Sequence, residues 1–203
     1  MPPPTNGYRM LARSELPSDT VQLARFLIGK MVVRELPEGI AAGRIVETEA
    51  YPIGDPAGHA HRGLTPRNKV LFGERGHAYV YLAYGVSFML NVSSEAPGVG
   101  AGVLIRAIEP TAGIAVMQQN RGAVPARDVA RGPGRLCMAL AIDRRLDGID
   151  LCRPGPLWLG SDGEAPGEIG ISQRIGITRA ADALLRFYVR DSRFVSGPQA
   201  LNR

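Results

Sequence analysis

One short segment of the chain combines two carboxylates with an aromatic ring: residues 45–51, with the sequence IVETEAY. Side chains alternate along a β-strand, so Glu47, Glu49 and Tyr51 should share one face, with the carboxylates about 6 to 7 Å apart. If that face is partly buried, desolvation and mutual repulsion should raise the pKa values of both carboxyl groups. The segment therefore predicts a general base. An exposed edge strand with solvated acids is the alternative.

The irregular segment 52–67 follows and is rich in Gly, Pro, His and Arg. His59 and His61 are two residues apart, and His77 adds a third imidazole without a recognisable spacing. A zinc site needs three or four ligands, and no cysteine lies nearby, so we predict no metal. Imidazoles that hydrogen-bond or stack on a flat substrate fit better, with ordinary loop histidines as the alternative.

A tyrosine-rich segment comes next, with the sequence YVYLAYG at residues 79–85. Tyr79 and Tyr81 should share a strand face, whereas Tyr84 precedes Gly85, where the strand should turn. Such stripes are commonly part of a core. An aromatic ring at an exposed tip of a basic protein can instead wedge into a stack of nucleic-acid bases.

Arginines form a further group, in the segment RGPGR at residues 131–135, which leads into an expected helix. Free amides at a helix start, flanked by Arg131 and Arg135, suit a DNA phosphate. We predict phosphate contacts from these two residues and from Arg67. A Pro/Gly loop with solvated arginines is the alternative.

The chain has 203 residues, a net charge of +5 and a pI of about 9.6. Of its 24 basic residues only Lys30 and Lys69 are lysines. Arginine suits phosphate oxygens and bases, although codon usage in a G·C-rich genome would also explain the excess. Cys137 and Cys152 make no disulfide framework. No apolar run could cross a bilayer and no export signal is evident, so we expect a cytoplasmic protein without a membrane partner.

Strand patterns outnumber helix patterns and do not alternate with them. We expect helices from Ser18-Asp19 and over 113–119 and 135–142, and strands over 31–35, 43–50, 78–83, 102–108, 176–178 and 185–190. This order favours the α+β class: a single compact domain with a curved, mainly antiparallel sheet surrounded by helices. Residues 1–10 are expected to be disordered or extended, and 11–203 to form the domain. The chemical groups together suggest an acid/base enzyme acting on a flat ring attached to a phosphate chain.

The same residues resemble the alkyladenine DNA glycosylase family (3-methyladenine DNA glycosylases), which lacks the helix-hairpin-helix of other glycosylases. The resemblance runs in order from about Leu11 to Gly197. It implies a monomeric α+β domain without metal or organic cofactor, acting on double-stranded DNA that contains damaged purines. Its motifs are IVETEAY, DPAGHAHRG with TPRN, YVYLAYG, MLNVSS, LIRAIEP, GPGRLCMALAI, RIGIT, LRFYVR and FVSG.

The resemblance also implies roles for single residues. Glu49 matches the general base, which deprotonates a water that attacks the anomeric carbon of a flipped nucleotide. Arg106 matches the arginine that helps hold this water and the nucleotide backbone. Tyr84 matches the residue that intercalates into the gap left by the flipped base.

The base pocket is implied in the same way. Tyr51, His59 and Tyr81 match positions that sandwich and hydrogen-bond the flipped base. Asn91 matches the residue that disfavours normal purines by clashing with the exocyclic amine of guanine. The expected activity is that of a monofunctional DNA glycosylase of base excision repair, which removes alkylated or deaminated purines and leaves an abasic site.

Two other readings compete. A DNA-binding protein without catalysis would use the arginines and Tyr84, but it would not explain a carboxylate pair, because carboxylates repel phosphate. A sugar glycoside hydrolase would use Glu47 and Glu49 as its acid pair. Such pairs normally face each other across a cleft, which two neighbours on one strand do poorly.

Overall fold

The computed structural model describes residues 7–202 of the chain, and nine strands within them form one antiparallel sheet. The strand order is β1-β7-β2-β3-β6-β5-β4, and the β8–β9 hairpin joins the sheet where β9 pairs with β3. The strands are β1 Arg9–Met10, β2 Met31–Leu36, β3 Gly39–Tyr51, β4 Ala78–Ala83, β5 Ser87–Ser93, β6 Gly102–Ala112, β7 Leu157–Ser161, β8 Ile169–Ser172 and β9 Arg186–Val189. Of the predicted terminal segment, residues 1–6 lie outside the described part, as does residue 203, whereas β1 pairs with β7.

Three α-helices are described: α1 Thr20–Leu27, α2 Ile114–Arg121 and α3 Pro133–Ala139. Helix α1 begins where the sequence predicts, because the side chain of Asp19 accepts a hydrogen bond from the N–H of Gln22 at 2.8 Å. Helix α2 lies between Gly113 and Gly122, both in the left-handed region. Short 3₁₀ turns cover Arg13–Glu15, Lys69–Phe72, Ala126–Asp128, Arg144–Leu146 and Gln199–Leu201.

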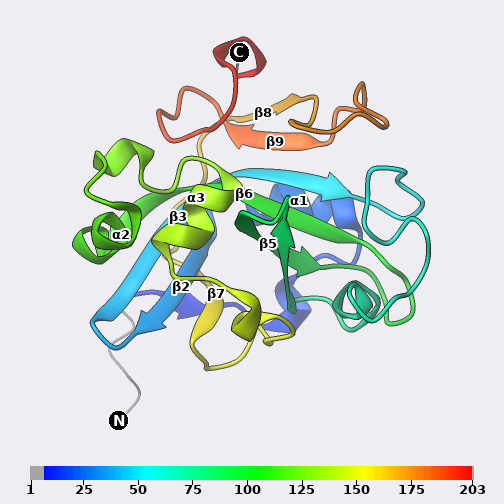
Figure 1. Cartoon of the computed structure of the whole chain (residues 1–203), viewed down its shortest axis with the longest axis horizontal. Coiled ribbons are helices and arrows are strands. Elements are labelled where there is room, and N and C mark those ends of the chain that lie inside the picture. Colours follow the sequence, from blue (N-terminus) through cyan, green and yellow to red (C-terminus); the bar gives the residue numbers. More distant parts are fainter. Residues whose placement is uncertain (1–6, 203) are drawn as a thin grey trace.

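The core joins the sheet to all three helices. Helix α1 packs against β3 and β6, α3 packs against β5 and β6, and α2 packs on α3 (Figure 1). Apolar residues of these helices, such as Leu23, Met117 and Leu136, belong to one buried cluster with the strands. This arrangement confirms the predicted α+β class with a mainly antiparallel sheet.

Strand β3 holds the centre of the molecule. Its first half pairs with β2, residues 42–51 run along β6, and Glu47–Glu49 also pair with β9. The β8–β9 hairpin therefore lies above the end of β3, with the C-terminal segment beside it (Figure 1). The pairing with β6 shifts register on both sides of Glu47, and such irregularities redirect side chains.

One predicted strand is wrong. Residues 176–178 form bends rather than a strand, and β8 pairs with β9 in their place. Gly176 has φ +78°, a left-handed conformation that interrupts an extended strand. Strands β5 and β7 were not predicted, the second because Pro- and Gly-rich sequence surrounds it. No helix within residues 7–202 has the length and apolar character to cross a membrane.

Candidate active site

The second half of β3 carries both carboxylates into the interior. Glu47 and Glu49 are each 0% exposed, because β6 lies along one edge of the strand and β9 along the other. The alternative of solvated acids on an exposed edge is therefore wrong. A carboxylate buried to this extent stays ionised only where charges or hydrogen-bond donors compensate for the lost water.

Glu47 is enclosed by two arginines and a backbone amide. Its Oε1 accepts hydrogen bonds from Nε of Arg106 at 2.8 Å and Nε of Arg186 at 2.7 Å, and its Oε2 accepts the N–H of Ser196 at 2.7 Å. Desolvation raises the pKa of Glu47, but the two guanidinium groups outweigh it and hold the pKa below its usual range. The prediction of a raised pKa is therefore wrong for Glu47, because arginine compensates for the neighbouring carboxylate.

Glu49 has three partners, two hydrogen-bond donors and one ion-pair partner. Its Oε1 lies 3.1 Å from Nη1 of Arg106 and accepts the N–H of Ile175 at 2.7 Å. Its Oε2 accepts the hydroxyl of Tyr51 at 2.9 Å. Burial and the adjacent Glu49 raise the pKa of Tyr51, so the phenol keeps its proton and donates it. The carboxylate is thus fixed in orientation.

Arg106 connects the two carboxylates. Burial lowers its pKa, but Glu49 and Glu47 outweigh this effect and raise the pKa overall, so the guanidinium stays charged. The charges of Arg186, Glu47, Arg106 and Glu49 therefore alternate in sign through the interior. Such an array holds its members in place, since moving one would leave a buried charge without its partner.

A cavity of about 370 Å³ opens beside this array. All three partners of Glu49 line it, namely Tyr51, Arg106 and Ile175. The carboxylate therefore stands directly behind the cavity wall. Predicted base-pocket residues His59, Tyr81 and Asn91, together with Tyr84 from the predicted wedge, line the same cavity.

Aromatic rings build the wall away from Glu49. The rings of Tyr79 and Tyr81 stack with centroids 5.3 Å apart, and the His59 ring lies 4.2 Å from that of Tyr81. Nδ1 of His59 is 2.9 Å from the Tyr79 hydroxyl. Burial, followed by the charge of Arg67, lowers the pKa of His59, so the imidazole is neutral at pH 7. Nδ2 of Asn91 donates to the Tyr79 carbonyl at 3.2 Å.

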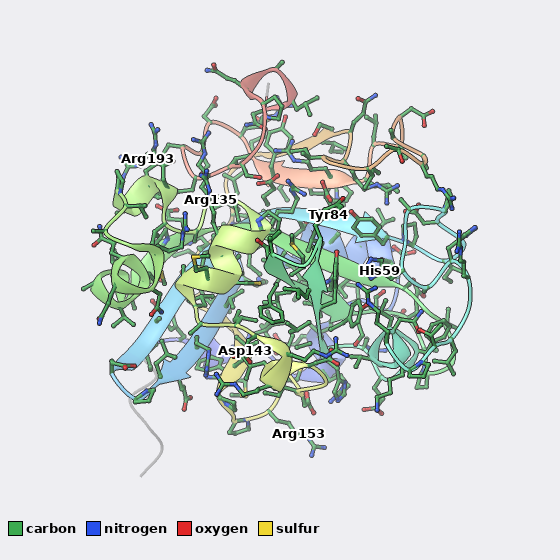
Figure 2. All side chains as sticks on the ribbon, viewed as in Figure 1. His59, Tyr84, Arg135, Asp143, Arg153 and Arg193 are labelled. Atoms are coloured by element: carbon green, nitrogen blue, oxygen red, sulfur yellow. The ribbon has the colours of Figure 1, made fainter. Side chains whose placement is uncertain are left out.

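The turn between β4 and β5 presents Tyr84 to solvent, as the sequence predicts. Its side chain is 90% exposed and its φ is +51°, a left-handed conformation uncommon for a bulky residue. Val86 is 77% exposed at the same turn. A second cavity, of about 570 Å³, is lined by Tyr84 and by residues of the segment 52–67, among them His59 and Arg67. Figure 2 shows His59 and Tyr84 on the same side of the molecule.

The three predicted phosphate contacts fall into two places. Arg67 lines the second cavity, and its guanidinium lies 5.6 Å from the centroid of the Tyr81 ring. Arg131 and Arg135 line a third cavity, of about 390 Å³, together with Arg106. Arg106 also lines the first cavity, so both cavities share this residue.

The surroundings of Arg131 and Arg135 differ in part from the expectation. Helix α3 begins at Pro133, earlier than predicted, and has seven residues. Nε of Arg131 donates to the Val195 carbonyl at 2.7 Å, so this side chain also serves the fold. Arg135 lies on α3, on the side of the molecule that Figure 2 presents to the reader.

The three histidines have separate surroundings. His59 contacts Tyr79, Nδ1 of His61 lies 3.2 Å from the Gly54 carbonyl, and Nδ1 of His77 lies 3.3 Å from Arg13. Within residues 7–202, no group of three or more His, Cys, Asp and Glu side chains is placed to hold a metal ion.

Several residues of the site were missed by the sequence reasoning. Arg186 and Ser196 hold Glu47, Ile175 holds Glu49, and a buried ion pair joins Arg174 to Asp55. An arginine inside an otherwise apolar strand, as in the segment LRFYV, could have indicated a buried cation. The backbone N–H of Ile175 leaves no such signal in the sequence.

Comparisons with known proteins agree with this geometry. Residues 14–193 match the family model described as methylpurine-DNA glycosylase. A protein of Mesorhizobium japonicum named "Putative 3-methyladenine DNA glycosylase" is 71% identical over 94% of this chain and 92% of its own length. Proteins of the same name from Paraburkholderia phytofirmans and Methanoculleus marisnigri are 53% and 47% identical, over 94% and 88% of this chain and 90% and 94% of their own lengths. The chain belongs to the methylpurine-DNA glycosylase family.

Proposed function

We propose that this DNA glycosylase flips alkylated or deaminated purines out of double-stranded DNA and hydrolyses their N-glycosidic bond with a water activated by Glu49. Membership of the family makes the protein a hydrolase of N-glycosyl bonds that acts on DNA. The observation that carries the finer proposal is the buried carboxylate of Glu49, fixed by two hydrogen-bond donors and one arginine that all line one aromatic cavity.

The chemistry follows from the partners of Glu49. Its Oε2 accepts the Tyr51 hydroxyl, and a carboxylate oxygen has a further lone pair for a water. The water proton passes to Glu49 while the water oxygen bonds to the anomeric carbon. The electron pair of the glycosidic bond leaves with the base, and an abasic site remains. Arg106 supplies a fixed positive charge beside the water and the sugar.

The cavity suits a flat base. The aromatic faces of Tyr51 and Tyr81 would hold the base between them, and neutral His59 would hydrogen-bond its edge. Asn91 would exclude guanine by contact with its exocyclic amine. Alkylated purines carry positive charge, which aromatic faces attract. Damage that weakens pairing or stacking also lowers the cost of extrusion.

The exposed groups suit the surrounding duplex. Tyr84 would occupy the gap left by the flipped nucleotide, since its ring projects from a turn beside the cavity mouth. Three arginines would contact phosphates on either side of the flipped nucleotide, namely Arg67, Arg131 and Arg135. Arg106 lines both the first cavity, which would hold the base, and the third cavity, which Arg131 and Arg135 line. All these groups come from one chain, so the proposed active form is a monomer.

The test is base release under single-turnover conditions, with protein in excess over duplexes that carry one hypoxanthine or one 7-methylguanine. We expect release from both lesion duplexes and none from the matched undamaged duplex. Affinity for the duplex should fall steeply with salt, because phosphate contacts release counterions.

Two outcomes would overturn the proposal. Tight binding to the lesion duplex without release would indicate a lesion-binding protein that lacks the chemistry. Hydrolysis of an aryl glucoside without release of any base would indicate a sugar hydrolase. The second outcome would also require a second free carboxylate, whereas Glu47 is fully engaged by arginine and a backbone amide.

A further inference from the structure

Arg174 lies outside the cavity yet contacts the segments that build it. Its side chain is 0% exposed, so it cannot touch a base or a water in the cavity. It forms an ion pair with Asp55 through both terminal nitrogens, and Nη1 also donates to the Ala50 carbonyl at 2.9 Å. A buried cation of this kind is costly unless its geometry is well satisfied.

These contacts join three separate parts of the chain. Ala50 belongs to the end of β3, Asp55 to the loop that also carries His59, and Arg174 itself to the bends that follow β8. Nη2 adds a contact of 3.4 Å to the Ala180 carbonyl within those bends. The position of the segment after β8 is therefore set by Arg174 and Asp55.

Both hydrogen-bond donors to Glu49 depend on this arrangement. The guanidinium of Arg174 lies 4.7 Å from the centroid of the Tyr51 ring, whose hydroxyl donates to Oε2 of Glu49. The residue directly after Arg174 is Ile175, whose N–H donates to Oε1. Arg106, the ion-pair partner of Glu49, is held by a different group, Glu47.

We propose that Arg174 is a positioning residue, which orients the carboxylate of Glu49 by fixing the Tyr51 hydroxyl and the Ile175 amide. The inference rests on the proposed function, because it concerns the same carboxylate. Arginine is needed here for its planar fork, which pairs with Asp55 and stacks on Tyr51 at the same time. Lysine could keep the charge but not the stack and the paired contact.

The test compares Arg174→Lys with Arg44→Lys. Arg44 lies on β3 and pairs with Asp162 at 2.5 Å. This ion pair joins residues 118 positions apart in the chain, and the pair of Arg174 with Asp55 joins residues 119 positions apart. Arg44 has no contact with Glu49, so it is a matched control. We expect Arg174→Lys to lower the single-turnover rate constant about tenfold or more, with the affinity for a hypoxanthine duplex kept within about threefold. Arg44→Lys should leave both unchanged.

With folded protein in saturating excess over the duplex, the single-turnover rate constant is independent of the fraction of folded protein, so partial unfolding does not imitate this result. An unchanged rate constant in Arg174→Lys would overturn the inference, as would equal losses of rate and affinity. If Arg174→Lys does not fold, the double variant Asp55→Asn with Arg174→Gln removes both buried charges together. An unchanged rate constant in this double variant, or equal losses of rate and affinity, would likewise overturn the inference.

A second readout needs no activity. The amide proton of Ile175 donates to a carboxylate, and its NMR chemical shift reports that hydrogen bond. The resonance should move in Asp55→Asn, which breaks the ion pair without changing the residue next to Ile175, and stay in place in Arg44→Lys. Movement in neither variant would refute the role of Arg174, whereas absence of base release by the wild type would refute only the proposed function.

Discussion

The interior around Glu47 and Glu49 and the exposed turn at Tyr84 differ in almost every physical respect. The carboxylates are 0% exposed and held by arginines and amides, whereas Tyr84 is 90% exposed in a left-handed conformation. The first region is complete within the protein. The second presents exposed apolar side chains, those of Tyr84 and Val86. On the proposed function, chemistry that depends on fixed charges would thus be kept apart from recognition that depends on insertion.

This division gives the protein two kinds of sensitivity. Substitutions in the interior should change reaction rate or stability, because buried charges lose their partners. Substitutions at the turn should change binding alone, because exposed side chains contribute little to folding. Three substitutions test the division, and their expected effects decrease in order.

The largest effect is expected for Glu49→Gln. The amide keeps the size of the side chain but cannot take the proton of the attacking water, so excision should fall by several orders of magnitude. Affinity for a lesion duplex should be kept. Single-turnover base release and duplex titration measure the two quantities, with the exposed Glu168→Gln as control. Retained excision would place the general base elsewhere and break the division.

Glu47→Gln should act on stability. It leaves Arg106 and Arg186 without their shared anion, which should cost about 3 to 5 kcal/mol of unfolding free energy. Because the pKa of Glu47 is depressed, its contribution is present above the unfolded value of 4.5 and is lost as pH falls through the folded value. Urea unfolding should therefore show wild-type stability declining in acid, and a flatter profile in the variant.

The control for this experiment is Glu38→Gln, in the exposed turn between β2 and β3. It should leave both the stability and its pH profile as in the wild type. If Glu47→Gln is as stable as the wild type at neutral pH, the alternating array does not hold the interior together.

The smallest effect is expected for Tyr84→Ala. Loss of an inserted ring should weaken the lesion complex by about 1 to 3 kcal/mol, while Tm stays unchanged because the ring is exposed. Equilibrium titration of lesion and undamaged duplexes measures the difference, with Leu64→Ala as an exposed apolar control. Equal weakening of both duplexes would remove the wedge role and leave Tyr84 as a general contact.

The sequence predicted what local pattern determines. The α+β class, the start of α1 at Asp19 and the placing of Tyr84 at a turn all follow from alternation, capping and turn residues, and the structure confirms them. The motif IVETEAY also identified the strand that carries the carboxylates. Their proposed roles stay predictions until base release is measured.

The rest depends on contacts between distant parts of the chain. The pKa of Glu47 was predicted in the wrong direction, since its neighbours on the strand were visible but Arg106 and Arg186 were not. The expected strand at 176–178 was wrong for a related reason. Its bends place Ile175 against Glu49, and only the folded chain shows that this N–H has a partner.

The partners of Glu47 have a consequence for synthesis of the protein. Arg186 lies 139 positions after Glu47, and Ser196 lies 149 positions after it. A ribosome therefore makes the strand with both carboxylates long before it makes Arg186 and Ser196, which are two of the three groups that donate to Glu47. A growing chain that stops short of these residues lacks two of the three donors that hold Glu47 in the interior. On the proposed function, base excision would therefore require a chain whose translation has passed Ser196.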